Sequence, residues 1–227
     1  MALTIRPLIQ DDLPMAGRII RLAFGTFLGV PEPENFWSDL GYAQTRWQVD
    51  PSAAFAAELN GELVGSNFAT RWGSIGFFGP LSVRPDVWDQ RVGQLLMTPI
   101  MERFAAWGVQ HAGLFTFAHS PKYLGLYQKY GCWPRFLTAI MSKPVAARVD
   151  GFSGSRYSIL PPSAQDACLQ ACREVTETLY DGLDVSREIR SVATQGLGDT
   201  VLLYEGETLV GLAICHCGPG TEAGTLS

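Results

Sequence analysis

An irregular strand, a polar loop and a long helix follow one another in the middle of this 227-residue chain. The strand over residues 74–83 is expected to bulge or splay, because it contains three poor strand formers, Gly76, Gly79 and Pro80. Apolar residues then recur at helical spacing over residues 93–108, and Gly108 occupies the position of a helix C-cap. The sequence therefore predicts a splayed strand that leads through a loop into the start of a long helix.

The loop between these two elements, residues 83–95, has the features of an anion-binding site. The first N–H groups of a helix have no partner within the helix, and the helix dipole favours negative charge beside them. Gly93 would let a phosphate approach the backbone closely, and Arg91 could add a positive charge. The alternative is an ordinary surface loop with glycine at a turn. The sequence contains neither a Gly-Lys-Ser/Thr phosphate loop nor a Gly-x-Gly-x-x-Gly motif after an early strand.

The rest of the first two thirds of the chain is predicted from apolar periodicity and turn residues. Acidic residues at 10–12 favour a helix start, and Asn60-Gly61 tolerates the positive φ of a tight hairpin. In chain order we expect a strand over 4–7, a helix from 10–12 to 23, a helix over 36–48, hairpin strands over 55–59 and 63–70, the strand over 74–83, the helix over 93–108, a strand over 112–118, a helix over 123–130 and a last strand or strand pair over 132–142.

The last third of the chain repeats part of this pattern after a Gly/Ser-rich segment at residues 150–156. Glu62-Leu63-Val64-Gly65 is matched by Thr208-Leu209-Val210-Gly211, an offset of 146 residues from Gly65 to Gly211. The second copy stops before the equivalent of the phosphate loop. We therefore expect a domain over 1–148, a linker over 149–156 and a partial second domain over 157–227.

Such a half-domain would leave a sheet edge exposed near Ser227, which is an aggregation liability unless something covers it. We expect it to pack on the first domain or to pair with another chain as a homo-oligomer. An alternative is that the chain is a fragment of a longer tandem protein.

Composition excludes several classes of function. The net charge of −5 gives no basic footprint for nucleic acid or for an anionic membrane surface. Arg6, Asp11 and Asp12 interrupt any signal-peptide core, and no apolar run approaches the ~20 residues of a membrane span. We expect a soluble, cytoplasmic protein with no nucleic-acid or membrane partner.

Five cysteines do not form the dense framework of a small secreted protein, so reduced thiols are expected. Cys215-His216-Cys217 is predicted to alternate along a strand, so its two sulfurs would point one way and its imidazole the other. Without a second ligand pair, buried strand residues are favoured over a zinc site, and no metal site is predicted.

Two motifs together resemble the GNAT acetyltransferase superfamily. The family's pyrophosphate loop reads Gln/Arg-x-x-Gly-x-Gly/Ala, and Gln90, Gly93 and Leu95 occupy those positions, with Leu95 in place of the small residue. The segment 120–132, SPKYLGLYQKYGC, is similar to the family's Asn-x-x-Ala-x-x-Leu-Tyr-x-Lys-x-Gly-Phe segment. The resemblance covers residues 3–142. It implies an α/β (α+β) GNAT fold, in which helices flank a mixed central sheet with a splayed strand pair, followed here by a C-terminal partial repeat.

The resemblance also implies a cofactor and a reaction. The cofactor would be acetyl-CoA (coenzyme A), and the reaction would be acetyl transfer to an amine by direct attack on the thioester. The residues implied to bind the cofactor are Leu81, Val83, Gln90, Arg91, Val92, Gly93, Gln94, Leu95 and Ser120. The backbone of Leu81 and Val83 would pair with the cofactor's amides like an added strand, and the Val83 N–H would stabilise the oxyanion.

Tyr127 matches the family's tyrosine and would protonate the departing thiolate; without the motif, a core tyrosine would be the alternative. The family's usual glutamate base is missing, because residues 73–83 contain no carboxylate. His119 is the predicted base, since an ordinary imidazole titrates near neutral pH. Glu58 is a more distant option, and a water relay or a substrate that enters deprotonated would serve instead.

The acceptor is expected to be a small-molecule or peptide amine. Aromatic residues of the early helices and the splayed strand could line its pocket or simply belong to the core: Trp37, Tyr42, Trp47, Trp72 and Phe77. The alternative function is a non-catalytic acyl-CoA-binding or regulatory module, favoured by the missing glutamate, by Leu95 and by Ser120 in place of asparagine.

Overall fold

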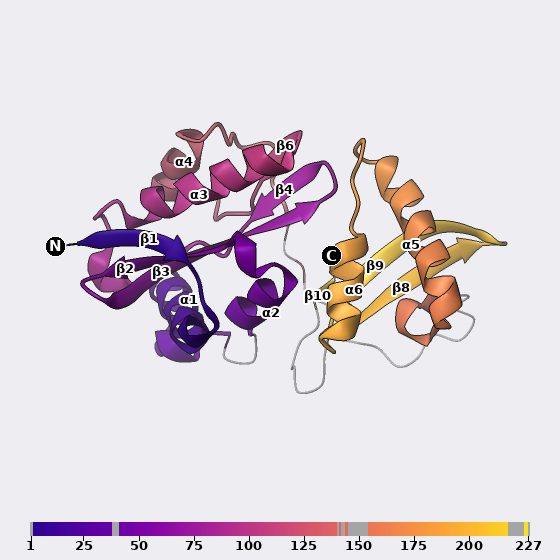
Figure 1. Cartoon of the computed structure of the whole chain (residues 1–227), viewed down its shortest axis with the longest axis horizontal. Helices are drawn as coiled ribbons and strands as arrows, with labels where there is room; N and C mark the ends of the chain where they lie inside the picture. The colour runs from indigo at the N-terminus through magenta and orange to yellow at the C-terminus, as the bar shows by residue number, and fades with distance from the viewer. Residues whose placement is uncertain are drawn as a thin grey trace.

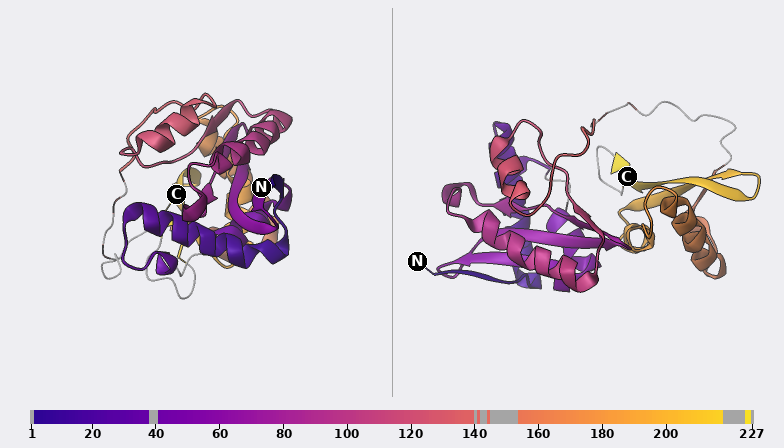
Figure 2. Two further views of the ribbon diagram at one scale, coloured as in Figure 1. Left: turned by 90° about the vertical axis from the view of Figure 1, so that its left-hand side faces the viewer. Right: turned by 90° about the horizontal axis from the view of Figure 1, so that it is seen from above.

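The computed structural model describes residues 2–37, 41–139, 141, 144, 154–217 and 225–226. Two sheets, each with its own helices, lie side by side (Figure 1), and a view from above shows the same arrangement (Figure 2). A prediction that falls on residue 1, 38–40, 140, 142–143, 145–153, 218–224 or 227 lies outside the described residues.

The first sheet is mixed and has six strands. Its order is β1-β2-β3-β4-β6, with β5 also paired to β3. All the pairs are antiparallel except β4 with β6, which is parallel. The predicted hairpin turn is confirmed by the positive φ of Asn60 (52°) and Gly61 (87°). The strands are β1 (Leu3–Pro7), β2 (Ala54–Leu59), β3 (Glu62–Trp72), β4 (Ile75–Phe78), β5 (Ser82–Val83) and β6 (His111–Gly113).

Helices cover both faces of this sheet: α1 (Leu13–Leu28) and α2 (Tyr42–Val49) on one face, and α3 (Val92–Trp107) and α4 (Pro121–Gln128) on the other (Figure 1). The residues of β2 alternate between two cores. Ala54 and Ala56 pack in the core that contains α1, whereas Phe55, Ala57 and Leu59 pack in the core that contains α3. Because both faces are covered, β2 is apolar along nearly its whole length.

The helix predicted over 93–108 is confirmed as α3. Leu96, Met97 and Ile100 are fully buried, and Gly108 closes the helix with φ 63°. Helix α1 likewise ends at a left-handed glycine, Gly29. Short 3-10 turns accompany the helices and loops at Gln10–Asp12, Pro33–Asn35, Pro51–Ala53, Pro85–Val87 and Tyr157–Ile159.

Several predicted boundaries are wrong. The strand over 74–83 is two strands, β4 and β5, because the segment between them leaves the ladder. The helix predicted over 36–48 begins only at Tyr42. Residues 132–139 and 141 form no strand, since no neighbouring strand pairs with them within the described part of the chain.

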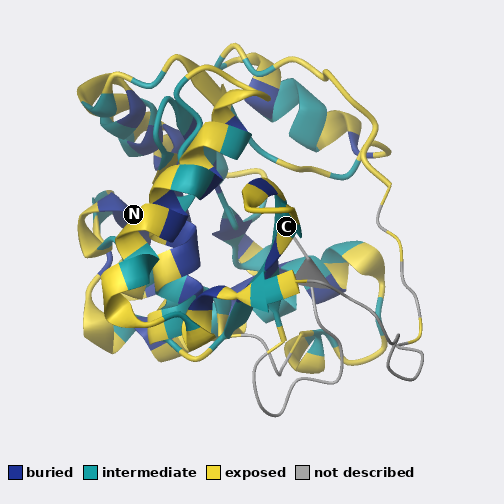
Figure 3. Cartoon of the chain, turned by 90° about the vertical axis from the view of Figure 1, so that its right-hand side faces the viewer, coloured by how far each residue is buried: buried dark blue, intermediate teal, exposed yellow. Residues whose placement is uncertain are grey.

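The second sheet is antiparallel, in the order β10-β9-β8-β7, and has its own buried core, which includes Cys172, Ile189 and Leu202. The buried sides of its helices face the sheet, and the exposed sides face solvent (Figure 3). Its elements are β7 (Gly154–Arg156), α5 (Pro162–Glu177), α6 (Ser186–Thr194), β8 (Gly198–Glu205), β9 (Thr208–His216) and β10 (Thr225–Leu226). β7 therefore lies inside the stretch 149–156 that was expected to be a linker.

The element order of the second half repeats that of the first: strand, two helices and a hairpin. The ladder irregularity supports this match. The register shifts between Ala57 and Glu58 in the first hairpin and between Leu203 and Tyr204 in the second, which is the same offset of 146 residues. A bulge at equivalent positions indicates that the two hairpins share their geometry and not only their sequence pattern.

The two halves contact each other through the turn between β3 and β4. Gly73 forms a bridge with Leu183, and the Ser74 N–H donates to the Gly182 carbonyl oxygen at 2.8 Å. A charged contact lies beside this turn, where Arg46 of α2 reaches Glu188 of α6 at 3.1 Å. No helix of the described residues is long and apolar enough to cross a bilayer.

Gly73→Ala is expected to loosen this contact. Gly73 has φ 62°, and a Cβ there would overlap the carbonyl oxygen of Gly182. We expect a loss of about 2–3 kcal/mol in the free energy of unfolding, measured by urea titration. Gly108→Ala is the matched control, because Gly108 has φ 63° with nothing within 4 Å of the added Cβ. Equal losses for the two variants would contradict a role of this contact in stability.

Candidate active site

The site opens where β4 and β6 part. Their parallel ladder runs from Ile75 opposite His111 to Phe77 opposite Gly113 and ends there. The strand predicted over 112–118 is wrong in extent, because β4 diverges after Phe77 and residues 114–118 have no ladder partner. The predicted splay of the strand pair is thus present, and the space between the two diverging segments is a cavity.

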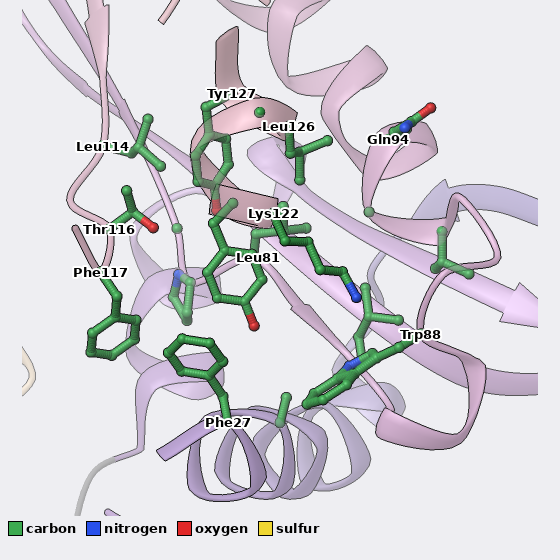
Figure 4. A pocket seen from close by; sticks show the side chains of 18 of the residues that line it. Phe27, Leu81, Trp88, Gln94, Leu114, Thr116, Phe117, Lys122, Leu126 and Tyr127 are labelled. Atoms are coloured by element: carbon green, nitrogen blue, oxygen red, sulfur yellow. The ribbon is translucent and has the colours of Figure 1, made fainter. Parts of the chain in front are cut away.

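The cavity has a volume of about 470 Å³, within the usual range for ligand pockets. Its wall comes from α1, the 78–83 segment, the start of α3, residues 114–117 and α4. Figure 4 shows Thr116, Phe117 and Tyr127 on one side of this space and Trp88 and Gln94 on the other. The cavity therefore extends from the first turn of α3 to the hydroxyl of Tyr127.

The first turn of α3 presents uncapped amides to this cavity. Arg91 is the N-cap residue, with φ 63° and no side-chain capping bond, and Asp89 two residues earlier also has positive φ (65°). The N–H groups of Val92, Gly93 and Gln94 have no acceptor four residues back in the helix. Gly93 lines the cavity without a Cβ, so a ligand can approach its backbone.

Polar contacts hold the loop before α3 in place. The Trp88 indole N–H donates to the Val83 carbonyl oxygen at 2.7 Å. Lys122 Nζ lies 2.7 Å from the Asp89 carboxylate and 5.5 Å from the centroid of the Trp88 ring. The Tyr130 hydroxyl donates to the Gln94 carbonyl oxygen at 2.7 Å. The loop is therefore tied to both β5 and α4 without using the amides of α3.

The ladder geometry orients the backbone of Val83. Val83 lies opposite Gly65, and the next residue, Arg84, donates its N–H to the Val64 carbonyl oxygen at 2.8 Å. Bonded and non-bonded pairs alternate in an antiparallel ladder, so the N–H and C=O of Val83 point away from β3. The Val83 carbonyl oxygen accepts the Trp88 indole N–H, whereas the Val83 N–H is directed to the cavity side of β5.

Tyr127 points into the cavity from α4 (Figure 4). Its side chain is only 9% exposed, and its ring packs edge-on against Phe78 at 5.7 Å between centroids. Burial is the main cause that raises the pKa of Tyr127 well above its ordinary value of 10; nearby Tyr123 and Cys132 act in the same direction, and a hydrogen bond with Thr116 opposes them. The phenol is therefore protonated throughout the neutral range.

Most of the residues that the sequence implied for the cofactor line the cavity together with Tyr127: Leu81, Val83, Arg91, Val92, Gly93 and Gln94. Gln90 and Leu95 are exposed and lie outside its lining. Ser120 is buried and caps α4, accepting the Tyr123 N–H at 3.3 Å. The roles assigned to all of these residues stay predictions.

The predicted bases lie outside the cavity lining. His119 is exposed and stacks on Phe27, with 5.5 Å between ring centroids. Glu58 is paired with Arg6 at 2.8 Å on β1 and β2. Asp89 is the only carboxylate among the described lining residues. The role of His119 or Glu58 as the base stays a prediction.

The aromatic residues that line the cavity are not those singled out from the sequence. Trp37, Tyr42, Trp47, Trp72 and Phe77 lie outside the lining, where Trp47 donates to the Leu8 carbonyl oxygen and Trp72 stacks on Phe77. Phe24, Phe27, Phe117 and Tyr123 line it instead. The three-residue spacing of Phe24 and Phe27 places them on one face of α1, which was the available signal.

A model of the acetyltransferase (GNAT) family matches residues 20–132. Residues 20–132 belong to the GNAT acetyltransferase family. The match includes β4, the loop before α3, all of α3 and Tyr127, so the cavity lies within the GNAT domain. None of the curated proteins compared with the chain is a significant match.

Solved structures share the GNAT fold at low sequence identity. A protein from Pyrococcus horikoshii assigned as an acetyltransferase is 17% identical over 88% of this chain and 68% of its own, with a TM-score of 0.56. A GNAT-family acetyltransferase from Staphylococcus aureus Mu50 is 12% identical over 57% of this chain and 84% of its own, with a TM-score of 0.50. The first alignment is too long to be confined to the GNAT domain, so the likeness of fold extends into the second half.

Proposed function

We propose that this chain is an N-acetyltransferase that transfers an acetyl group from acetyl-CoA to an amine by direct attack. GNAT acetyltransferases use acetyl-CoA as the acyl donor. The observation that carries the proposal is a single cavity that joins the uncapped amides of α3 to the Tyr127 hydroxyl. One end would bind the diphosphate of the cofactor, and at the other end Tyr127 would act as a proton donor beside the reacting thioester.

The residues of this cavity fit coenzyme A. The N–H groups of Val92, Gly93 and Gln94 would bind the diphosphate, and Arg91 and Lys122 would add positive charge. The pantetheine arm would occupy the space between the diverging strands, where the backbone of β5 faces it. Bound acetyl-CoA supplies a thioester, which is an activated acyl group.

Two groups of the chain would then act on the reaction. The Val83 N–H would donate to the thioester carbonyl oxygen as that oxygen gains negative charge. The Tyr127 hydroxyl would donate its proton to the departing sulfur. The raised pKa of Tyr127 keeps its hydroxyl protonated at neutral pH, which a proton donor requires.

A second candidate function is a non-catalytic acyl-CoA-binding module. It is favoured by the state of Asp89, the one described carboxylate of the lining, whose side chain is 80% exposed and already paired with Lys122. A site without a free base cannot deprotonate an ammonium efficiently. The two candidates share the cofactor site and differ only in turnover.

Calorimetric titration with acetyl-CoA, followed by a thiol-release assay with a panel of amines, separates the candidates. The enzyme predicts binding and amine-dependent release of coenzyme A. Binding that raises Tm without turnover on any amine would support the module instead. Failure to bind acetyl-CoA would refute both.

Gly93→Ala tests the cofactor site without disturbing the fold. A Cβ at Gly93 would meet Leu126, Val83 and Leu81 at 3.7–4.0 Å, which is ordinary contact, and alanine favours a helix by about 1 kcal/mol over glycine. We expect unchanged or higher Tm and an acetyl-CoA Kd raised about tenfold, because the methyl group enters the phosphate end of the cavity. An unchanged Kd would contradict binding at this turn.

We further propose the division into a GNAT domain over 1–148 and a partial second domain over 157–227. The separate cores and the repeated element order support it. The contacts of Gly73 and Arg46 favour packing of the second domain on the first, and association with another copy of the chain stays a prediction. A sedimentation profile of a monomer with a disordered C-terminal third would contradict this packing.

A further inference from the structure

Beyond Tyr127 the cavity ends in a cluster of aromatic rings. Phe27 of α1 lies at its centre, with ring centroids 5.0 Å from Phe117, 4.9 Å from Tyr123 and 5.5 Å from His119. Phe24, one helical turn earlier, lies 6.2 Å from Phe117. Figure 4 shows Phe27 and Phe117 facing the same space as Tyr127. The end of the cavity opposite the start of α3 is therefore a largely apolar recess walled by aromatic rings.

No carboxylate of the described residues faces this recess. The charged side chains of the whole cavity lining are Asp89, Arg91, Lys122 and Lys129. The lining parts of α1 and of residues 78–83 contribute none. The titratable groups at the recess are Tyr123 and Tyr127 from α4 and the exposed His119 before it. An alkylammonium ion would thus enter without a counter-ion, which is costly in an apolar site.

The amine must also be neutral when it attacks. At pH 7 fewer than about one in a thousand molecules of a lysine-like amine, whose pKa is about 10.4, carry a free lone pair. An amine bonded directly to an aromatic ring is neutral at pH 7, because the ring delocalises its lone pair. Such an acceptor needs no carboxylate base and presents a flat face to aromatic walls.

We propose that the acceptor is an arylamine, a primary amine attached directly to an aromatic ring that packs in the recess of Phe24, Phe27, Phe117 and Tyr123. The inference rests on the proposed acetyltransferase function and names its substrate class. The amine nitrogen forms a bond to the thioester carbonyl carbon, and the carbon–sulfur bond breaks with its electron pair on sulfur. The nitrogen loses a proton to water, and sulfur gains one from Tyr127, which is reprotonated from water. The products are an N-aryl acetamide and the thiol of coenzyme A.

The rings could instead bind an ammonium ion through cation–π contacts, but their arrangement does not favour it. Phe27 and His119 are stacked at an interplanar angle of 19°, so each covers a face of the other. A cation needs a free ring face. The two faces that meet in this pair are therefore not free to bind a cation.

The test compares two isomeric acceptors, p-toluidine and benzylamine, with spermidine as a polycation, by thiol release from acetyl-CoA on the full chain. We expect kcat/KM at pH 7 for p-toluidine to exceed that for benzylamine by at least about tenfold. From pH 6 to pH 9 the p-toluidine value should stay nearly constant, whereas any benzylamine activity should rise about tenfold per pH unit with its neutral fraction. Preference for benzylamine or spermidine at pH 7 would overturn the proposal.

Variants of the recess residues test where the acceptor binds. Phe27→Leu and Phe117→Leu should each raise KM for p-toluidine about fivefold while leaving the Kd of acetyl-CoA unchanged. Phe136→Leu is the matched control, since Phe136 is 83% exposed and outside the lining, and its KM should equal that of the wild type. Unchanged KM in both recess variants would overturn the placement. Loss of acetyl-CoA binding, or no turnover with any amine, would refute the proposed function itself, whereas turnover restricted to alkylamines would refute only the inference.

Discussion

Tyr127→Phe is expected to lower kcat for acetyl transfer by about 100-fold, within the range of general acid catalysis. The variant removes only the hydroxyl that faces the cavity, and the ring can keep its edge contact with Phe78. Because the hydroxyl acts on the departing sulfur, the Kd of acetyl-CoA should change less than about twofold. Steady-state thiol release and calorimetric titration measure the two quantities.

Tyr130→Phe is the matched control for this variant. Tyr130 follows α4 and lies outside the cavity lining, and its hydroxyl donates to the Gln94 carbonyl oxygen rather than facing the cavity. Loss of this hydrogen bond should lower the free energy of unfolding by about 1 kcal/mol and leave kcat within about threefold of the wild type. A kcat of Tyr127→Phe equal to that of Tyr130→Phe would remove Tyr127 from the mechanism.

The pH dependence of the wild type provides a separate check on Tyr127. Its pKa is raised above the ordinary value of 10, so the catalytic proton is present below that pH and is lost only at higher pH. With an acceptor that is neutral throughout, kcat should show no decline between pH 7 and pH 10. A decline centred below pH 9 would indicate that another group supplies the proton.

Arg46→Ala is expected to reduce the free energy of unfolding by about 3 kcal/mol, the scale of breaking one side of a buried ion pair. Arg46 Nη1 lies 3.1 and 3.2 Å from the two carboxylate oxygens of Glu188, whose residue is only 5% exposed. His216 Nε2 lies 3.5 Å from the same carboxylate. The variant leaves a buried charge between α2, α6 and β9, and urea unfolding measures the loss.

Low pH should remove the stability that this ion pair contributes. Burial pushes the pKa of Glu188 up, but the hydrogen bond from His216 and the charges of Arg46 and His216 outweigh it and lower the pKa below 4.5. A lowered carboxylate pKa stabilises the fold above that ordinary value, and the contribution is lost as pH falls through the folded-state pKa. Arg46→Ala removes one of the lowering charges, so acid unfolding should begin at a higher pH than in the wild type.

Two further variants serve as controls for the predicted effect of Arg46→Ala on stability. Arg46→Met with Glu188→Leu replaces the pair by apolar side chains and should return stability close to that of the wild type. Arg18→Ala breaks a pair with Glu34 in which both side chains are about half exposed, and its effect should be much smaller. If Arg46→Ala had the same free energy of unfolding as the wild type, the stability of the two halves would not depend on this pair.

Local sequence patterns predicted those elements whose determinants lie within a few residues of one another. The periodicity that ends at Gly108, the positive φ of Asn60 and Gly61, and the apolar face of α1 each act within one helical turn or one hairpin. The loop from Gln90 to Leu95 and the segment around Tyr127 are likewise contiguous, so a family motif could identify them. The choice of Tyr127 as a candidate follows from this local motif, whereas its position at the cavity depends on how distant elements pack.

Tertiary packing decided the rest, because strands and pockets depend on partners distant in the chain. Residues 114–118 have the composition of a strand but none of its pairing, since β4 diverges after Phe77 and no ladder forms without a neighbour. The aromatic recess joins Phe27 to Phe117 across 90 residues, and the ion pair joins Arg46 to Glu188 across 142. Periodicity specifies which face of an element is apolar, but which element covers that face is settled only when the whole chain packs.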